Sequence, residues 1–419
     1  MKKLFFIFCA GIISFSGCKD SVTETITYMI NEPVFMPAQA FRASVKVTTR
    51  SEVISSQGKM CFYNGYIYIS EAEKGIHIIN NNNPENPQNV GFIELIGNAD
   101  LAIRNDKLYA DSYIDLVWFD ISTPSEPVLE GRLENAFQDA VPTPENEYGA
   151  DYNYLYNYDG KQGVIVGWRL TTRTQTITYE SSVLYDVVTR PSTNGGVSSG
   201  GVGVNGSMSR FALYEHYLYS VINNYMSIID LSGEEPVKAV EKRYIGSNVE
   251  TIFSYKDNMF MGTPTGMLIY SVTDPLAPQY ISAVSHVFGC DPVVVENDIA
   301  YVTIHSGNFC GQNTNELIIY DVSNVYNPKL LVSYAMTKPK GLGVDNSILF
   351  LCDDGLKIFD ASNPQTLIGK NLAHYTGMEG YDVIPFDNVL MMIADDGLYQ
   401  YDYSDLSDIR LLSKLPIVR

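Results

Sequence analysis

A pattern of about 41 residues recurs along the chain and constrains its fold more than any other feature. Each copy has a short apolar strand, a turn with Asn or Asp, a second apolar strand, and a third strand that commonly ends in Asp. Several copies continue into a turn with Pro, which ends a strand because it fixes φ and donates no hydrogen bond. The matching residue of the second strand recurs at spacings of 41, 110, 41, 41, 49 and 41 residues, at Tyr68, Tyr109, Tyr219, Phe260, Tyr301, Phe350 and Met391.

This repeat predicts an all-β chain folded as a single β-propeller. A fourth strand after the prolines completes a four-stranded blade, and about 40–45 residues is the usual length of one blade. The copies cover about 57–134 and 207–416. We expect 136–206 to be an insertion, because 163–168 and 174–179 look like one strand hairpin without the proline turn. Seven blades are therefore predicted, and eight are the alternative if the insertion contains a degenerate blade.

The third strand and the turn after it resemble a known repeat. The pattern Gly-apolar-x-Ile-Ile-Asp-x-Ser-x-Pro-x-x-Pro resembles the LVIVD-repeat β-propellers, which are common among secreted and lipid-anchored bacterial proteins. The resemblance implies the propeller fold over most of the chain. It implies little about function, because function lies in sites built on a fold. The clearest copies lie at residues 75–91, 226–237, 315–334 and 355–364.

The N-terminus has the form of a bacterial lipoprotein signal. Two Lys precede an apolar stretch over 4–15 that is too short to span a bilayer. The sequence Phe-Ser-Gly that precedes Cys18 resembles a lipobox. Residues 1–17 are therefore predicted to be a signal peptide, Cys18 the lipidated residue, and 18–40 a tether to a propeller that spans 41–419. An ordinary cleaved signal with a chance cysteine is the alternative.

The residues after Cys18 and the overall charge bear on localisation. Cys18-Lys19-Asp20 resembles the start of the surface-export signal of Bacteroidota lipoproteins. It predicts a lipoprotein of the outer membrane, exposed at the cell surface, and a periplasm-facing position is the alternative. The net charge of −20 argues against a nucleic-acid partner and against a basic membrane-binding face. A hydrophobic content of 45% is enough for a sizeable core.

One face of the predicted ring collects charged residues close to the axis. In a propeller, the loop that leads into the first strand of a blade lies on the same face as the loop between its second and third strands. Such a face can hold a polar ligand or Ca²⁺, and an ordinary solvated rim is the alternative. The residues are Lys59, Asp100, Arg210, Glu250, Asp291, Lys340, Glu379 and Asp382, with the loop acids Asp353, Asp354, Asp395 and Asp396.

The cysteines suggest a second candidate site. Two His and two Cys are gathered within 286–310. We predict a disulfide between Cys290 and Cys310, because it is the simpler outcome in an oxidising compartment. A tetrahedral zinc site and free thiols are the alternatives. Cys61 and Cys352 fall on or beside predicted inner strands and are expected to be buried thiols.

Two further motifs lie in the insertion. Gly201–Gly206 spells G-x-G-x-x-G, but a propeller strand follows it instead of a helix, so we predict a flexible loop and no dinucleotide site. Alternating tyrosines on one strand face form a candidate sugar-stacking platform, and packing against the ring is the alternative. The platform residues are Tyr152, Tyr154, Tyr156, Tyr158 and Trp168.

No set of catalytic residues is apparent in the sequence. It shows no ordered Ser-His-Asp set and contains only five His. We therefore predict a non-catalytic binding or scaffold module for a partner protein or a glycan, without a cofactor. The alternative is a carbohydrate-active or other hydrolytic enzyme that uses acids at the mouth of the propeller channel.

Overall fold

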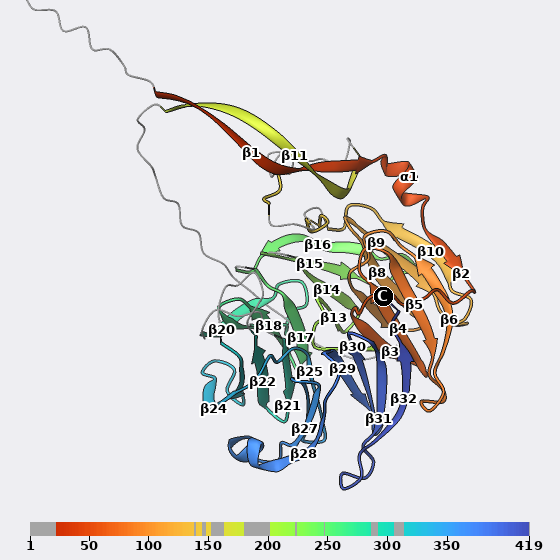
Figure 1. Ribbon diagram of the computed structural model, residues 1–419, viewed down its shortest axis with the longest axis vertical. Coiled ribbons are helices and arrows are strands. Elements are labelled where there is room, and N and C mark those ends of the chain that lie inside the picture. The colour runs from red at the N-terminus through yellow and green to blue at the C-terminus, as the bar shows by residue number, and fades with distance from the viewer. Residues whose placement is uncertain are drawn as a thin grey trace, which may run out of the picture.

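The structure is a seven-bladed β-propeller (Figure 1). The first strand of each blade lies beside the first strand of the next, and blade 7 contacts blade 1 to close the ring. The all-β prediction and the preferred count of seven blades are confirmed, and the eight-blade alternative is excluded. This computed structural model describes residues 22–137, 140–144, 148–151, 163–179, 202–222, 224–246, 248–285, 292–305 and 314–418.

Every blade is an antiparallel meander in which four strands pair in chain order. Blades 1 to 4 contain β3 (Met60–Tyr63), β4 (Tyr66–Glu71), β5 (Gly75–Asn80) and β6 (Gln88–Glu94); β7 (Leu101–Arg104), β8 (Lys107–Ser112), β9 (Asp115–Asp120) and β10 (Val128–Leu133); β13 (Phe211–Tyr214), β14 (Tyr217–Ile222), β15 (Tyr225–Asp230) and β16 (Val237–Tyr244); β17 (Thr251–Tyr255), β18 (Asn258–Thr263), β19 (Gly266–Ser271) and β20 (Gln279–Ser285). Blades 5 to 7 contain β21 (Val293–Glu296), β22 (Ile299–Ile304), β23 (Glu316–Asp321) and β24 (Lys329–Ala335); β25 (Leu342–Asp345), β26 (Ile348–Cys352), β27 (Leu356–Asp360), the 3-10 helix η1 (Pro364–Lys370) and β28 (Asn371–Tyr375); β29 (Gly380–Phe386), β30 (Val389–Ala394), β31 (Gly397–Asp402) and β32 (Arg410–Pro416).

Two local turns explain the polar residues of the repeat. Between the first and second strands of blade 2, Asn105 and Asp106 both have positive φ, of 51° and 58°. Such turns match the twist of the strands and favour Asn, Asp and Gly. At the end of the third strand, the Asp120 carboxylate accepts a hydrogen bond from the Ser122 N–H at 2.7 Å. This short Asp-x-Ser loop turns the chain towards the prolines.

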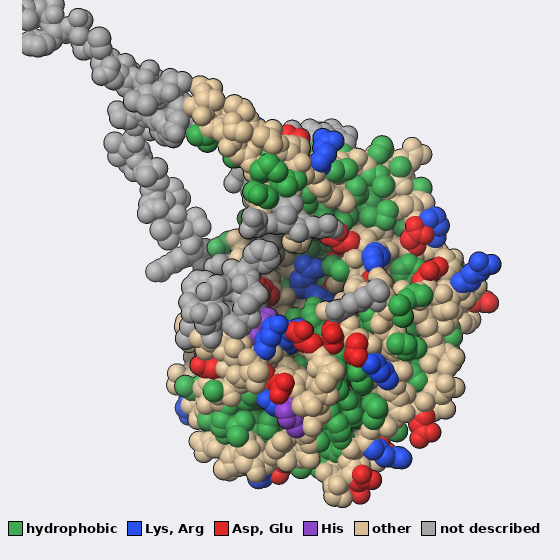
Figure 2. All heavy atoms as spheres, in the orientation of Figure 1, with side chains coloured by type: hydrophobic (Ala, Val, Ile, Leu, Met, Phe, Trp, Pro, Cys, Tyr) green, Lys and Arg blue, Asp and Glu red, His purple; other side chains and the backbone are tan. Residues whose placement is uncertain are grey.

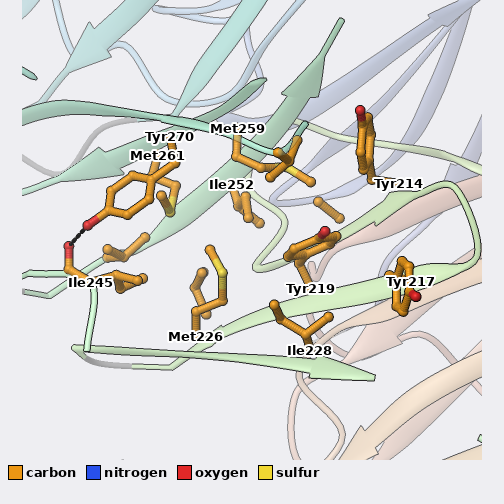
Figure 3. Close-up of a cluster of buried hydrophobic side chains, with 14 residues drawn as sticks. Tyr214, Tyr217, Tyr219, Met226, Ile228, Ile245, Ile252, Met259, Met261 and Tyr270 are labelled. Carbon is orange, nitrogen blue, oxygen red and sulfur yellow. Dashed lines mark hydrogen bonds between the residues drawn. The ribbon is translucent and has the colours of Figure 1, made fainter. Parts of the chain in front are cut away.

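Apolar residues of the strands pack blade against blade. Figure 3 shows the cluster between blades 3 and 4, where Tyr219 is fully buried and the Tyr270 hydroxyl donates to the Ile245 carbonyl at 2.9 Å. The Tyr219 hydroxyl donates to the Pro275 carbonyl of the next blade at 2.8 Å. The aromatic residue of the repeat therefore fills the interface and also binds the proline turn of its neighbour.

A two-stranded arm lies along one side of the ring and extends beyond it (Figure 1). It consists of β1 (Val22–Met36) and β11 (Val164–Tyr179), which pair antiparallel along their length. The predicted hairpin of 163–168 with 174–179 is wrong, because both stretches belong to β11. The five residues between them include no Gly, Pro, Asn or Asp to turn the chain, so it stays extended and pairs with β1. β1 lies within the segment predicted as a tether.

The base of the arm is fixed to the ring. A short helix, α1 (Ala38–Arg42), follows β1, and its Phe41 is buried beside Tyr113 of blade 2. Arg42 pairs with the buried Asp115 carboxylate at 2.9 Å. A short strand, β2 (Lys46–Thr48), then pairs with the outer edge of blade 1. Of the helices in the described ranges, none has the length and hydrophobicity needed to cross a membrane.

Candidate functional site: the mouth of the channel

The chain fills its own central channel with residues 202–210, which we call the plug. β12 (Val204–Asn205) pairs antiparallel with β3, the inner strand of blade 1. Farther along, the Ser209 carbonyl accepts a hydrogen bond at 2.9 Å from the Ile252 N–H of blade 4. The plug then continues into β13. The prediction of a flexible loop is therefore wrong for the described part of this glycine-rich segment.

The glycines of the plug are explained by close packing at the axis. A Cβ atom on Gly203 would lie 2.4 Å from the Cys61 sulfur, and one on Gly206 would lie 2.0 Å from a carboxylate oxygen of Asp382. A side chain at either position would therefore need neighbouring atoms to move. Cys61 and Cys352 are buried free thiols, as predicted.

Asp382 binds the plug at Ser207 and Met208. Its carboxylate accepts hydrogen bonds from the Ser207 N–H at 3.1 Å, the Ser207 hydroxyl at 2.9 Å and the Met208 N–H at 3.2 Å. It also accepts one from the Val383 N–H at 3.0 Å. The side chain is fully buried, and burial raises its pKa to about 6. Asp382, predicted as a ligand residue, therefore binds the protein's own backbone.

A second buried carboxylate, Asp100, brings together three of the predicted residues. It accepts a hydrogen bond from the Lys59 ammonium at 2.8 Å and from the Arg210 backbone N–H. The Arg210 guanidinium lies 3.8 Å from Asp111, whose other oxygen accepts the Ala99 N–H at 2.7 Å. Burial raises the pKa of Asp111 to about 6. The role of Asp111 was not apparent from the sequence, because this residue lies within β8.

In this cluster the two cations are partly exposed, whereas the two acids are buried. The side chains of Lys59 and Arg210 are 15% and 31% exposed, whereas those of Asp100 and Asp111 are 1% and 5% exposed. Figure 2 shows Lys and Arg side chains in the hollow at the centre of the ring. Tyr381 directly precedes Asp382 in β29, and burial, together with Asp382 and Asp100, raises its pKa to about 12. It was missed because tyrosines in the repeat are core residues.

The remaining predicted acids of blades 6 and 7 form a separate group. Glu379 accepts hydrogen bonds from Lys338 at 3.0 Å and Lys340 at 2.7 Å. Asp353 is buried and accepts the Lys338 N–H at 2.6 Å, and Asp395 accepts the Glu379 N–H at 2.8 Å. These acids line a pocket of about 520 Å³. Within the described ranges, no three His, Cys, Asp or Glu side chains are grouped as a metal site.

The remaining predicted residues are placed by other contacts or lie outside the described ranges. Glu250 directly precedes β17, and its backbone N–H donates to the Gly262 carbonyl at 2.9 Å. Trp168 lies on β11 of the arm, where its indole N–H donates to the Pro142 carbonyl at 2.6 Å. The others lie outside the described residues: Cys18, Tyr152, Tyr154, Tyr156, Tyr158, Cys290, Asp291 and Cys310.

The two buried acids predict how stability depends on pH. Asp111 and Asp382 have pKa values of about 6 in the fold, above the ordinary 3.8. Between about pH 4 and pH 6 the folded chain therefore binds more protons than the unfolded chain, and the free energy of unfolding falls as the pH rises through this window. Denaturant titration in this range should show the fall, and Asp382→Asn should make it shallower. A free energy that increases through the window in both proteins would contradict the assignment.

Comparison with known proteins agrees with the repeat and the fold. The LVIVD repeat model matches residues 99–134, 205–234 and 293–336, which lie in blade 2, the plug with blade 3, and blade 5. The chain carries LVIVD repeats folded as a β-propeller. These LVIVD repeats supply the Asp-x-Ser loops and proline turns described above. Among curated proteins no match was found.

Solved structures resemble this LVIVD-repeat propeller in fold alone. The periplasmic gluconolactonase PpgL of Pseudomonas aeruginosa is 9% identical with a TM-score of 0.51, over 89% of this chain and 97% of that chain. BamB from Moraxella catarrhalis is 8% identical with a TM-score of 0.47, over 90% and 97%. The computationally designed Ika8 protein is 9% identical with a TM-score of 0.48, over 88% and 89%.

Proposed function

We propose that this propeller is a non-catalytic binding module that takes up a glycan or a partner protein at the mouth of its channel. The main observation behind the proposal is that the buried acids already bind backbone N–H groups of the protein. Asp100 and Asp382 accept hydrogen bonds from the protein's own N–H groups and are at most 1% exposed. A general acid or base must reach the substrate, and these two carboxylates do not face solvent. Beside these two carboxylates, Lys59 and Arg210 are the more exposed groups, and both are hydrogen-bond donors that suit binding.

The proposal includes an anchor at the outer membrane. If Cys18 carries lipid, the first residue of β1 follows only four positions later, a reach of about 14 Å when extended. The arm would then lie next to the membrane, and its base would fix the ring to it through α1. In this arrangement the arm, together with the residues before it, serves as the tether.

The binding proposal is tested with the full chain in detergent on a glycan array and in a pull-down from solubilised outer membrane. We expect retention of a defined glycan or protein. Lys340 lies at the mouth with its side chain 16% exposed, so Lys340→Trp should obstruct the mouth and abolish retention. Lys256→Trp, on the opposite face, should have no effect. Silence in both assays, or equal retention by the two variants, would refute the proposal.

A hydrolytic enzyme remains the second candidate. The specific observation in its favour is the pocket between blades 6 and 7, which Asp354 and Asp396 line together with Glu379. Asp354 is 57% exposed and is therefore accessible to a substrate. The retained ligand should be incubated with the protein and its mass followed over time. Cleavage that is lost in Asp354→Asn would establish the enzyme in place of the binding module.

A further inference from the structure

We propose that the channel mouth binds an anionic oxygen group of the ligand, a carboxylate, sulfate or phosphate, between Lys59, Arg210 and Tyr381. This inference rests on the proposed binding function and specifies the ligand's chemistry. The three residues come from blades 1, 3 and 7, whose first strands surround the axis. The Asp100 carboxylate accepts hydrogen bonds from the Lys59 ammonium at 2.8 Å and from the Arg210 backbone N–H. The ligand group would lie above the plug, which closes the channel below it.

Arg210 offers the strongest unused donors. In the part of the chain that the structure describes, its guanidinium makes no hydrogen bond, and the nearest acid is Asp111 at 3.8 Å. It is 31% exposed, although its backbone is fixed by Asp100 and by the start of β13. A guanidinium has five N–H donors in a plane and binds carboxylate, sulfate or phosphate oxygens in pairs. Arg210 is therefore placed on a rigid support with its donors available.

Lys59 and Tyr381 supply further donors beside it. The Lys59 ammonium uses one of its three N–H donors for Asp100. Burial lowers its pKa, and the charge of Arg210 lowers it further. The Tyr381 hydroxyl makes no hydrogen bond to any described residue, and its pKa of about 12 keeps it protonated as a donor. Tyr381 directly precedes Asp382 in β29, and its carbonyl accepts the Gly341 N–H at 3.0 Å, which places its backbone beside the plug's acid.

The layering of charge selects an anion over a cation. The carboxylates of Asp100 and Asp382 lie beneath the cations and accept N–H groups of the plug and of the inner strands. A group that reaches this cluster therefore meets Lys59 and Arg210 before it meets Asp100 or Asp382. A ligand anion would also reduce the repulsion between these two cations.

The test compares four sugars that differ only at C6. The full chain in detergent is titrated by calorimetry with D-glucuronate, D-glucose 6-sulfate, D-glucose 6-phosphate and D-glucose. We expect at least one anionic sugar to bind with a Kd of about 1 mM or lower and glucose not to bind. The preferred anion identifies the source of the charge. Equal binding of glucose, or no binding of any anionic sugar, would overturn the inference.

Two variants assign the binding to this cluster. Arg210→Ala and Tyr381→Phe remove groups that form no hydrogen bond to described residues, so both proteins should fold, which thermal melting verifies. Each substitution should raise the Kd of the anionic sugar about tenfold. Arg410→Ala, which removes an exposed arginine on the outer strand of blade 7, is the matched control and should not change the Kd. Unchanged affinity in Arg210→Ala would overturn the inference about the anion. The proposed binding function would still stand if Lys340→Trp abolishes retention on the array.

Discussion

Replacing Gly206 by valine should lower the free energy of unfolding by about 3 kcal/mol or more. Its Cβ would lie 2.0 Å from one Asp382 carboxylate oxygen and 3.1 Å from the other. Asp382 cannot move aside easily, since four hydrogen bonds hold it and Gly341 packs against its other side. Overpacking of this kind costs about 1–3 kcal/mol, and here it also strains the acid that holds the plug. Denaturant unfolding measures the loss.

Gly167→Val provides the matched control for this change. Gly167 lies in β11, and no atom lies within 4 Å of the position its Cβ would take. Valine is favoured in strands, so this variant should stay within about 0.5 kcal/mol of the wild type. Equal stability of the two valine variants would show that residues 202–210 do not pack in the channel.

Asp382→Ala should have a similar effect for a different reason. The change leaves the N–H groups of Ser207, Met208 and Val383 without their acceptor in a fully buried position. Each unsatisfied buried group costs about 1–3 kcal/mol, so we expect a loss of about 4 kcal/mol in the free energy of unfolding. Chemical denaturation at neutral pH measures it.

Asp382→Asn separates the role of the oxygen from the role of the charge. The amide retains one oxygen as an acceptor but carries no negative charge, and burial already disfavours the charged carboxylate. The Asn variant should therefore lose much less stability than the Ala variant. A loss in Asn as large as that in Ala would mean that the plug is held by charge and not by hydrogen bonding.

The fold was predictable because its information is local and repeated. Each copy of the pattern contains its own hairpin turn, as at Asn105 and Asp106, and its own Asp-x-Ser loop, as at Asp120. These contacts lie within a few residues of one another, so one sequence is enough to predict them. The interface residues recur as well. Tyr219 is the aromatic residue of its repeat, and its hydroxyl binds the proline turn of the next blade.

The plug and the arm were not predictable in the same way. Both depend on pairing between distant segments, β12 with β3 and β1 with β11, and neither pairing repeats along the chain. The glycines at 203 and 206 were interpreted as part of a flexible loop. They are instead required because a side chain at either position would clash with Cys61 or Asp382.

For the candidate site, the sequence predicted the face but not the role of each residue. Position in the repeat was enough to bring Lys59, Asp100 and Arg210 to one mouth. It could not separate acids that bind backbone N–H groups from cations that stay exposed, because that depends on the plug. Tyr381 was missed because tyrosines in the repeat are core residues, whereas this one directly precedes Asp382.

We propose that the mouth of this plugged propeller binds its ligand without changing it chemically. The most direct measurement incubates the ligand retained by the full chain with wild type and with Lys340→Trp, and follows both bound ligand and ligand mass. We predict retention by the wild type, loss of retention in Lys340→Trp, and an unchanged mass throughout. Retention that persists in Lys340→Trp, or a product of altered mass that forms only with the wild type, would contradict the claim.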